Sequence, residues 1–127
     1  MRLFLVRHAE AAPGDPDDLR PLTHAGRTVA RALGERLRHE HPEAVLSSPL
    51  LRARETAEAI ARAAGLAPEA DERLAPGADL DAVRAAVEGR GEPVVVVGHQ
   101  PDCSEIVFAL TGRQESFAPG ALLEVEL

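Results

Sequence analysis

Residues 3–8 read LFLVRH, a short apolar run that ends in two basic side chains, Arg7 and His8. The same design returns at residues 93–99, where PVVVVGH ends in His99. Apolar runs of this length indicate strands that are covered on both faces of a sheet. In an open α/β sheet, ligands bind beyond the carboxyl ends of the strands. We therefore expect Arg7, His8 and His99 to meet at one sheet edge, in a site suited to an anion.

Length and composition narrow the class of protein. A chain of 127 residues predicts one domain over residues 1–127. The net charge of −7 and the absence of Trp and Tyr argue against nucleic-acid and anionic-membrane partners. No apolar run reaches membrane-spanning length, and charged residues interrupt the first run early, so we expect a cytoplasmic protein. A single cysteine, Cys103, excludes an internal disulfide. No long apolar surface stripe demands a second copy, so we expect a monomer.

Strand and helix patterns alternate along the chain. Apolar spacing predicts helices over residues 25–39, 49–64, 79–87 and 102–110, and further strands over residues 44–47 and 121–127. Residues 66–76 fit either an edge strand or an extended connection. The expected helix caps are Thr23, Ser48 with Pro49 after it, Asp79, and a capping box of Asp102 and Glu105. Strands separated by helices predict a three-layer α/β/α sandwich with a mostly parallel central sheet.

The strand at residues 44–47 delivers another basic residue to the same edge. Arg52 follows it in the first turn of a helix, where the helix dipole already favours an anion. Two guanidiniums and two imidazoles suit a dianionic phosphoryl group, because the forked donors of arginine match phosphate oxygens. A neutral imidazole is a competent nucleophile near pH 7, since its ordinary pKa is about 6.5. These residues predict a site for phosphoryl chemistry.

Simpler explanations exist for single residues. Arg52 fits a surface pair with Glu55 or Glu58, and His99 fits a satisfied core histidine. A metal site ranks below phosphate chemistry, because His8 and His99 lack the spacing of metal ligands and two arginines oppose a dication. The common location at one sheet edge favours the joint interpretation.

Four ordered segments resemble the histidine phosphatase superfamily, which has the phosphoglycerate mutase-like fold, and within it the SixA-type phosphohistidine phosphatases. They are LVRHAEA at 5–11, RPLT at 20–23 with Gly26, SSPLLRARETA at 47–57 and VGHQP at 97–101. The resemblance implies that His8 is the nucleophile and forms a covalent phosphohistidine. It implies that Arg7 and Arg52 hold the phosphoryl oxygens, and that His99 binds the group and stabilises its transition state. It also implies that no metal or organic cofactor is needed.

One expected part of the site is harder to place. Larger members of this family carry an acid that protonates the leaving group, and here the candidates are Glu72 and Asp79, of which Asp79 already suffices as a helix cap. A site without such an acid suits phosphohistidine or an activated aryl ester better than an alkyl ester, because these leaving groups, above all a protonated ring, depart readily. Ala9, where many relatives have glycine, is familiar in the SixA-type branch.

The short chain leaves no room for long lid insertions. We therefore expect a phosphorylated protein as partner, such as a histidine phosphotransfer domain. The alternatives are a small-molecule phosphomonoesterase of the same superfamily, acting on a small phosphorylated molecule, and a non-catalytic phosphate-binding module.

Overall fold

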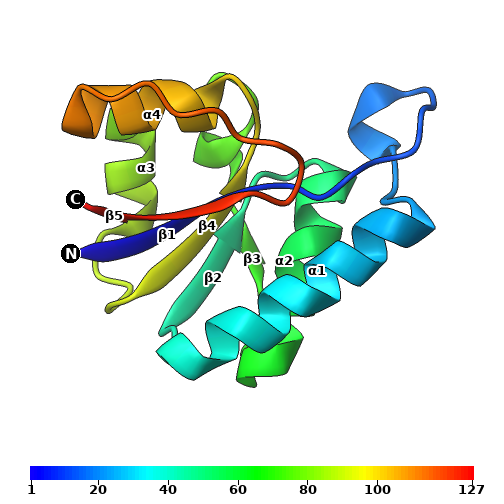
Figure 1. Ribbon diagram of the computed structural model, residues 1–127, viewed down its shortest axis with the longest axis horizontal. Helices are drawn as coiled ribbons and strands as arrows, with labels where there is room; N and C mark the ends of the chain where they lie inside the picture. Colours follow the sequence, from blue (N-terminus) through cyan, green and yellow to red (C-terminus); the bar gives the residue numbers. More distant parts are fainter.

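A central five-stranded sheet lies between two pairs of helices in the computed structural model, which describes residues 1–127 (Figure 1). The strand order is β3-β2-β4-β1-β5. The strands are β1 (Arg2–Arg7), β2 (Ala44–Ser47), β3 (Glu69–Ala70), β4 (Val94–Gly98) and β5 (Leu122–Glu126). The pairs β3–β2, β2–β4 and β4–β1 are parallel, and β5 runs antiparallel to β1. The predicted α/β/α sandwich with a mostly parallel sheet is confirmed.

The sheet is covered on both faces, as the uninterrupted apolar runs predict. Successive side chains of a strand point to opposite faces, so one strand feeds two cores. Val95 and Val97 of β4 pack with the helices over residues 24–37 and 51–64. Val94 and Val96 pack with the helices over residues 80–87 and 102–111. All four valines are essentially inaccessible to solvent, and burying each one stabilises the fold by roughly 1.5–3 kcal/mol. The central strands therefore form a rigid frame for the loops at their ends.

The helices are α1 (His24–Leu37), α2 (Leu51–Ala64), α3 (Leu80–Val87) and α4 (Asp102–Thr111). Helices α1 and α2 cover one face of the sheet, while α3 and α4 cover the other (Figure 1). Short 3-10 turns occupy residues Asp17–Leu19, Arg38–Glu40 and Glu72–Leu74. None of the helices has the length and apolar character needed to cross a bilayer.

Two predicted helix caps are wrong. Helix α2 begins two residues later than expected, at Leu51, and Leu50 rather than Ser48 is its N-cap. The Ser48 hydroxyl accepts a hydrogen bond from the Leu50 amide, and it also contacts the His99 ring. The capping box of α4 is also absent, because the Asp102 carboxylate accepts from the amide of Gly77 at 2.8 Å. Thr23 and Asp79 cap α1 and α3 as expected.

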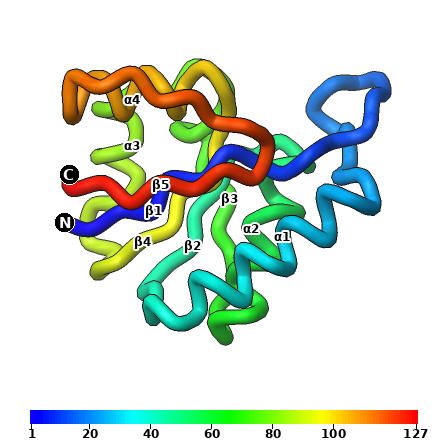
Figure 2. Tube along the Cα trace, viewed as in Figure 1, coloured from blue at the N-terminus to red at the C-terminus, as the bar shows by residue number.

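The two ends of the chain lie side by side, because β1 and β5 are neighbours in the sheet (Figure 2). The Leu127 amide donates to the Met1 carbonyl at 2.9 Å. This edge is the antiparallel one, which agrees with the expectation of a last strand at the sheet margin. Loops follow the carboxyl end of β1, next to Arg7 and His8.

Helix α1 approaches the segment after β1 very closely at Gly26. A Cβ atom at this position would lie 2.1 Å from the Glu10 carbonyl oxygen. That oxygen also accepts from the Thr23 amide at 3.0 Å, and the Thr23 hydroxyl accepts from the Gly26 amide at 2.9 Å. The start of α1 is thus pinned to the chain two residues beyond His8.

We expect Gly26→Ala to destabilise the protein by about 1–3 kcal/mol, because the added methyl group must displace backbone rather than a flexible side chain. Urea unfolding followed by circular dichroism measures the loss. Gly14→Ala is the matched control, since a Cβ there meets only the Arg20 side chain at 3.6 Å. Equal stability of the two variants would contradict the close approach.

Candidate active site

Three strand ends bring the site residues together. His8 follows β1, Ser48 follows β2 and His99 follows β4. The hydrogen bonding of the sheet extends one residue beyond β1 and β2. The His8 amide donates to the Gly98 carbonyl and the Ser48 amide donates to the Val97 carbonyl, each at 3.0 Å. The rings of His8 and His99 lie with their centroids 5.2 Å apart. The expected meeting of both histidines at one sheet edge is thus found.

His8 presents one unprotonated ring nitrogen. Its Nδ1 lies 2.7 Å from the Ala9 carbonyl oxygen, which accepts hydrogen bonds only. The Nδ1 atom therefore carries the proton of the neutral ring, and the Nε2 lone pair is available. Burial lowers the pKa of His8, and the positive charges of Arg52, Arg7 and Arg20 lower it further. The ring is consequently neutral near pH 7, as a nucleophile requires.

His99 is held by a hydroxyl. Its Nε2 lies 2.7 Å from Ser48 Oγ, which also accepts from the Leu50 amide at 3.2 Å. Burial lowers the pKa of His99 to about 4, aided by the charges of His8 and Arg52. Because a hydroxyl can both donate and accept, this contact suits either tautomer of the neutral ring. Ser48 therefore orients the His99 ring.

Arg7 is fixed from the far end of the chain. Its Nη1 donates to the Phe117 carbonyl at 2.8 Å, and its backbone pairs with Gly120 and Ala121. The Nε–H of Arg7 is buried and has no partner within the protein. A buried donor without an acceptor costs about 1–3 kcal/mol, and an anionic ligand that accepts from it would relieve that cost. This guanidinium is therefore built to meet an acceptor.

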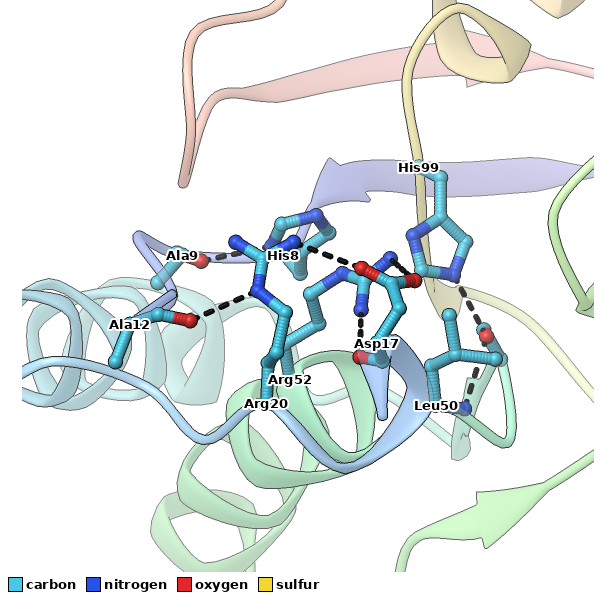
Figure 3. A network of polar contacts seen from close by, with 9 residues as sticks. His8, Ala9, Ala12, Asp17, Arg20, Leu50, Arg52 and His99 are labelled. Atoms are coloured by element: carbon cyan, nitrogen blue, oxygen red, sulfur yellow. Dashed lines mark hydrogen bonds and ion pairs between the residues drawn. The ribbon is translucent and has the colours of Figure 1, made fainter. Parts of the chain in front are cut away.

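Arg52 is bound by a carboxylate that the sequence analysis did not identify (Figure 3). Its Nη1 donates to the Asp17 carbonyl at 2.9 Å, and its Nη2 lies 3.2 Å from Asp17 Oδ2. The other carboxylate oxygen of Asp17 accepts from Arg20 at 2.9 Å, while the Nε of Arg20 donates to the Ala12 carbonyl at 2.8 Å. Asp17 thus bridges two guanidiniums beside His8. The surface pairs with Glu55 or Glu58 that an isolated helix allows are not formed by Arg52.

The Asp17 carboxylate is ionised near neutral pH. The hydrogen bond from Arg20, followed by that from Arg52, lowers its pKa below the ordinary value. Its side chain is 64% exposed, whereas that of Arg52 is only 10% exposed. Asp17 therefore forms an anionic rim over a buried cation.

Thr56 is another buried contributor that the sequence analysis missed. Its hydroxyl accepts from the Ala9 amide at 3.1 Å and donates to the Arg52 carbonyl at 2.8 Å. It thereby links the chain after His8 to the first turns of α2. Thr56 lies within the segment 47–57 that resembles the family, but a threonine one helical turn after Arg52 does not by itself indicate a site.

The two candidates for a general acid lie in the segment that follows β3. Asp79 accepts from the Ala82 amide at 2.9 Å and lines a groove between α3 and α4. Glu72 is exposed in the 3-10 turn after β3. Asp17 is the carboxylate whose charge acts on His99, where it opposes the lowering of the ring pKa.

No group of three His, Cys, Asp or Glu side chains is arranged to hold a metal ion. Cys103 packs in the core beneath the site, where burial raises the pKa of its thiol to about 12. The thiolate that a nucleophilic cysteine needs is therefore not formed near neutral pH.

Comparison with known proteins agrees with this geometry. Residues 3–76 match the model of the histidine phosphatase superfamily (branch 1). The chain belongs to the histidine phosphatase superfamily. An uncharacterized protein of Picosynechococcus sp. is 40% identical over 89% of this chain and 77% of its own length.

Two solved structures of this superfamily are similar in fold and sequence. The protein histidine phosphatase SixA, complexed with tungstate, is 30% identical with a TM-score of 0.87, over 100% of this chain and 88% of that one. The putative phosphohistidine phosphatase SixA from Agrobacterium tumefaciens is 26% identical with a TM-score of 0.81, over 97% and 89%. The chain is thus a histidine phosphatase of SixA type with the phosphoglycerate mutase-like fold, and its activity is that of a phosphatase.

In NMR titrations of the ligand-free protein, we expect the His99 ring to titrate at about pH 4 and the His8 ring below 6.5. Adding inorganic phosphate raises both midpoints, because the anion offsets the arginine charges and favours the imidazolium forms. The variants His8→Gln and His99→Gln assign the two signals. A His99 midpoint of 6.5 without phosphate would contradict its burial among cations.

Proposed function

We propose that this phosphatase removes phosphoryl groups from phosphohistidine on proteins, through a covalent phosphohistidine on His8. The observation that carries the proposal is the geometry of the site, in which the Nδ1 atom of His8 faces the Ala9 carbonyl and Asp17 bridges Arg20 and Arg52. His8 offers a neutral imidazole beside three arginines, while the one carboxylate in contact with them, Asp17, is ionised. A site of this kind supplies a nucleophile and positive charge but no carboxylic acid proton.

The leaving group then decides the substrate. An alkyl phosphate releases an alkoxide, which needs a proton from a general acid. A phosphohistidine whose ring is protonated on its other nitrogen releases a neutral imidazole and needs none. The ionised state of Asp17 thus favours the P–N bond over the P–O bond of an alkyl ester.

The roles of the surrounding residues follow from their positions. Arg7 and Arg52 donate to the phosphoryl oxygens, and the buried Nε–H of Arg7 gains the acceptor that it lacks in the protein alone. His99 donates from the nitrogen that does not face Ser48. Fixed donors of this kind stabilise the charge of the transition state without reorganising during the reaction.

Turnover takes two steps. The Nε2 lone pair of His8 forms a bond to phosphorus as the P–N bond of the substrate breaks, and that electron pair returns to the substrate ring. Water then attacks phosphorus, the bond to His8 breaks and dihydrogen phosphate leaves with both protons of the water. Splitting one transfer into two avoids direct attack by water on the substrate.

The similarity to SixA supports the same substrate class. That relative is described as a protein histidine phosphatase, and it binds tungstate, a tetrahedral oxyanion like phosphate. The segment before α1, with Leu19 58% exposed, leaves apolar surface beside Asp17 on which a protein substrate can rest.

The first test compares a histidine-phosphorylated phosphotransfer domain with p-nitrophenyl phosphate. We expect kcat/KM to be higher for the phosphoprotein, and His8→Ala to reduce turnover of both substrates by at least about 10³-fold, because no other side chain provides the nucleophile. A reaction quenched in alkaline detergent, which preserves the acid-labile P–N bond, should trap ³²P on the wild-type chain and not on His8→Ala. Activity on the ester with an untouched phosphoprotein would instead assign a small phosphorylated molecule as substrate.

A second test concerns Arg52. We expect Arg52→Ala to lower kcat/KM by about 10²-fold, the usual cost of one donor to a developing oxyanion. Arg54→Ala is the matched control, because Arg54 lies two residues along the same helix and is exposed. Steady-state kinetics on both substrates measures the effect. Equal activity of Arg52→Ala and Arg54→Ala would remove Arg52 from the reaction.

A further inference from the structure

We propose that Asp17 binds the protonated ring of the substrate phosphohistidine and so selects cationic leaving groups over neutral ones. This inference rests on the proposed function and adds a specificity residue to it. The sequence offers Glu72 and Asp79 as candidate acids. The carboxylate that contacts Arg20 and Arg52 comes instead from the 3-10 turn Asp17–Leu19.

The location of Asp17 agrees with that of a leaving group. His8 is buried, with 9% of its surface exposed, so a phosphoryl group attacked by its ring must carry its leaving group on the side of the solvent. Asp17 lies on that side and contacts the guanidinium of Arg52 (Figure 3). A phosphoryl oxygen and the Asp17 carboxylate would thus be joined through a single guanidinium.

Asp17 has acceptor capacity to spare. A carboxylate has about four lone-pair positions, and its two oxygens here receive one hydrogen bond each, from Arg20 and Arg52. The remaining positions belong to a side chain that is mostly exposed. Arg52 also retains donors, because Asp17 occupies only two of its five N–H groups. Both residues can therefore serve a ligand without separating.

The charges around Asp17 make this role compatible with an anionic phosphoryl group. Arg20 and Arg52 flank the carboxylate, and His99 is the titratable group whose charge it also influences. Arg7 adds a further positive charge on the inner side. The phosphoryl group therefore meets a net positive site. A cation beyond the phosphoryl group meets the exposed carboxylate of Asp17.

The proton balance explains the selectivity. In the transfer to His8 the P–N bond breaks, its electron pair stays on the substrate ring, and the ring proton already bound to the distal nitrogen makes the product a neutral imidazole. Asp17 accepts a hydrogen bond from that distal N–H before and during the transfer, which favours the protonated ring. With an ester, no cation is present to bind, and an ionised Asp17 has no proton to give.

The experiment measures kcat/KM of wild type, Asp17→Asn, Asp17→Glu and Asp18→Asn on the phosphorylated phosphotransfer domain and on p-nitrophenyl phosphate. We expect Asp17→Asn to lower the ratio of the two kcat/KM values, phosphoprotein over ester, by about 10-fold, since a charged hydrogen bond is lost only with the cationic leaving group. Asp17→Glu retains the charge and should restore part of the ratio. Asp18→Asn, next to it and exposed, should leave the ratio unchanged.

The pH dependence separates this role from mere support of Arg52. The effect of Asp17→Asn on the ratio should shrink as alkaline pH removes the proton of the substrate ring. Equal loss on both substrates, or no loss on either, would overturn the inference while wild-type turnover of the phosphoprotein still upholds the proposed function. A wild-type enzyme that leaves the phosphoprotein intact would overturn both.

Discussion

The parallel pairing of β1 with β4 determines where the reactive groups of this phosphatase lie. Arg7 pairs with Gly98 in the register, and the next amide, that of His8, still donates to the Gly98 carbonyl. Since side chains alternate along a strand, a shift of one residue would turn His8 to the other face and exchange the two cores. The buried valines of β4, divided evenly between those cores, make such a shift costly. The 5.2 Å separation of the two histidine rings is therefore a consequence of core packing.

The electrostatics of the site follow from the same arrangement. Four basic side chains at one edge repel one another, and burial disfavours their charged forms, so both histidines give up their protons near neutral pH. The arginines cannot do so, and Asp17 offsets part of their charge without filling their donor sets. The result is a set of fixed donors beside a neutral nucleophile, which is the state needed before a phosphoryl dianion arrives.

Much of this could be predicted from the sequence, because strand ends are local features. The runs before His8 and His99 predict buried parallel strands, and parallel strands share a carboxyl edge. Asp17 and Arg20 could not be predicted, because they lie in a loop whose path depends on contacts with α2 that leave no periodic pattern. The sequence predicts Ser48 as a helix cap, because a cap and a hydrogen bond to His99 both need a small side chain with a hydroxyl group. Tertiary contacts decided between the two roles.

The carboxylates of Asp17, Asp79 and Asp102 all accept hydrogen bonds within the fold. Asp79 is occupied by the first turn of α3, and Asp102 is occupied by the Gly77 amide, which holds the preceding loop against α4. Asp17 is ionised by its arginine partners. The hydrogen bonds from its arginine partners favour the charged form of Asp17, so this carboxylate is not an acid near pH 7. Asp17 therefore supplies no proton to a leaving group near pH 7, and the substrate proposed above, a phosphohistidine with a protonated ring, brings its own.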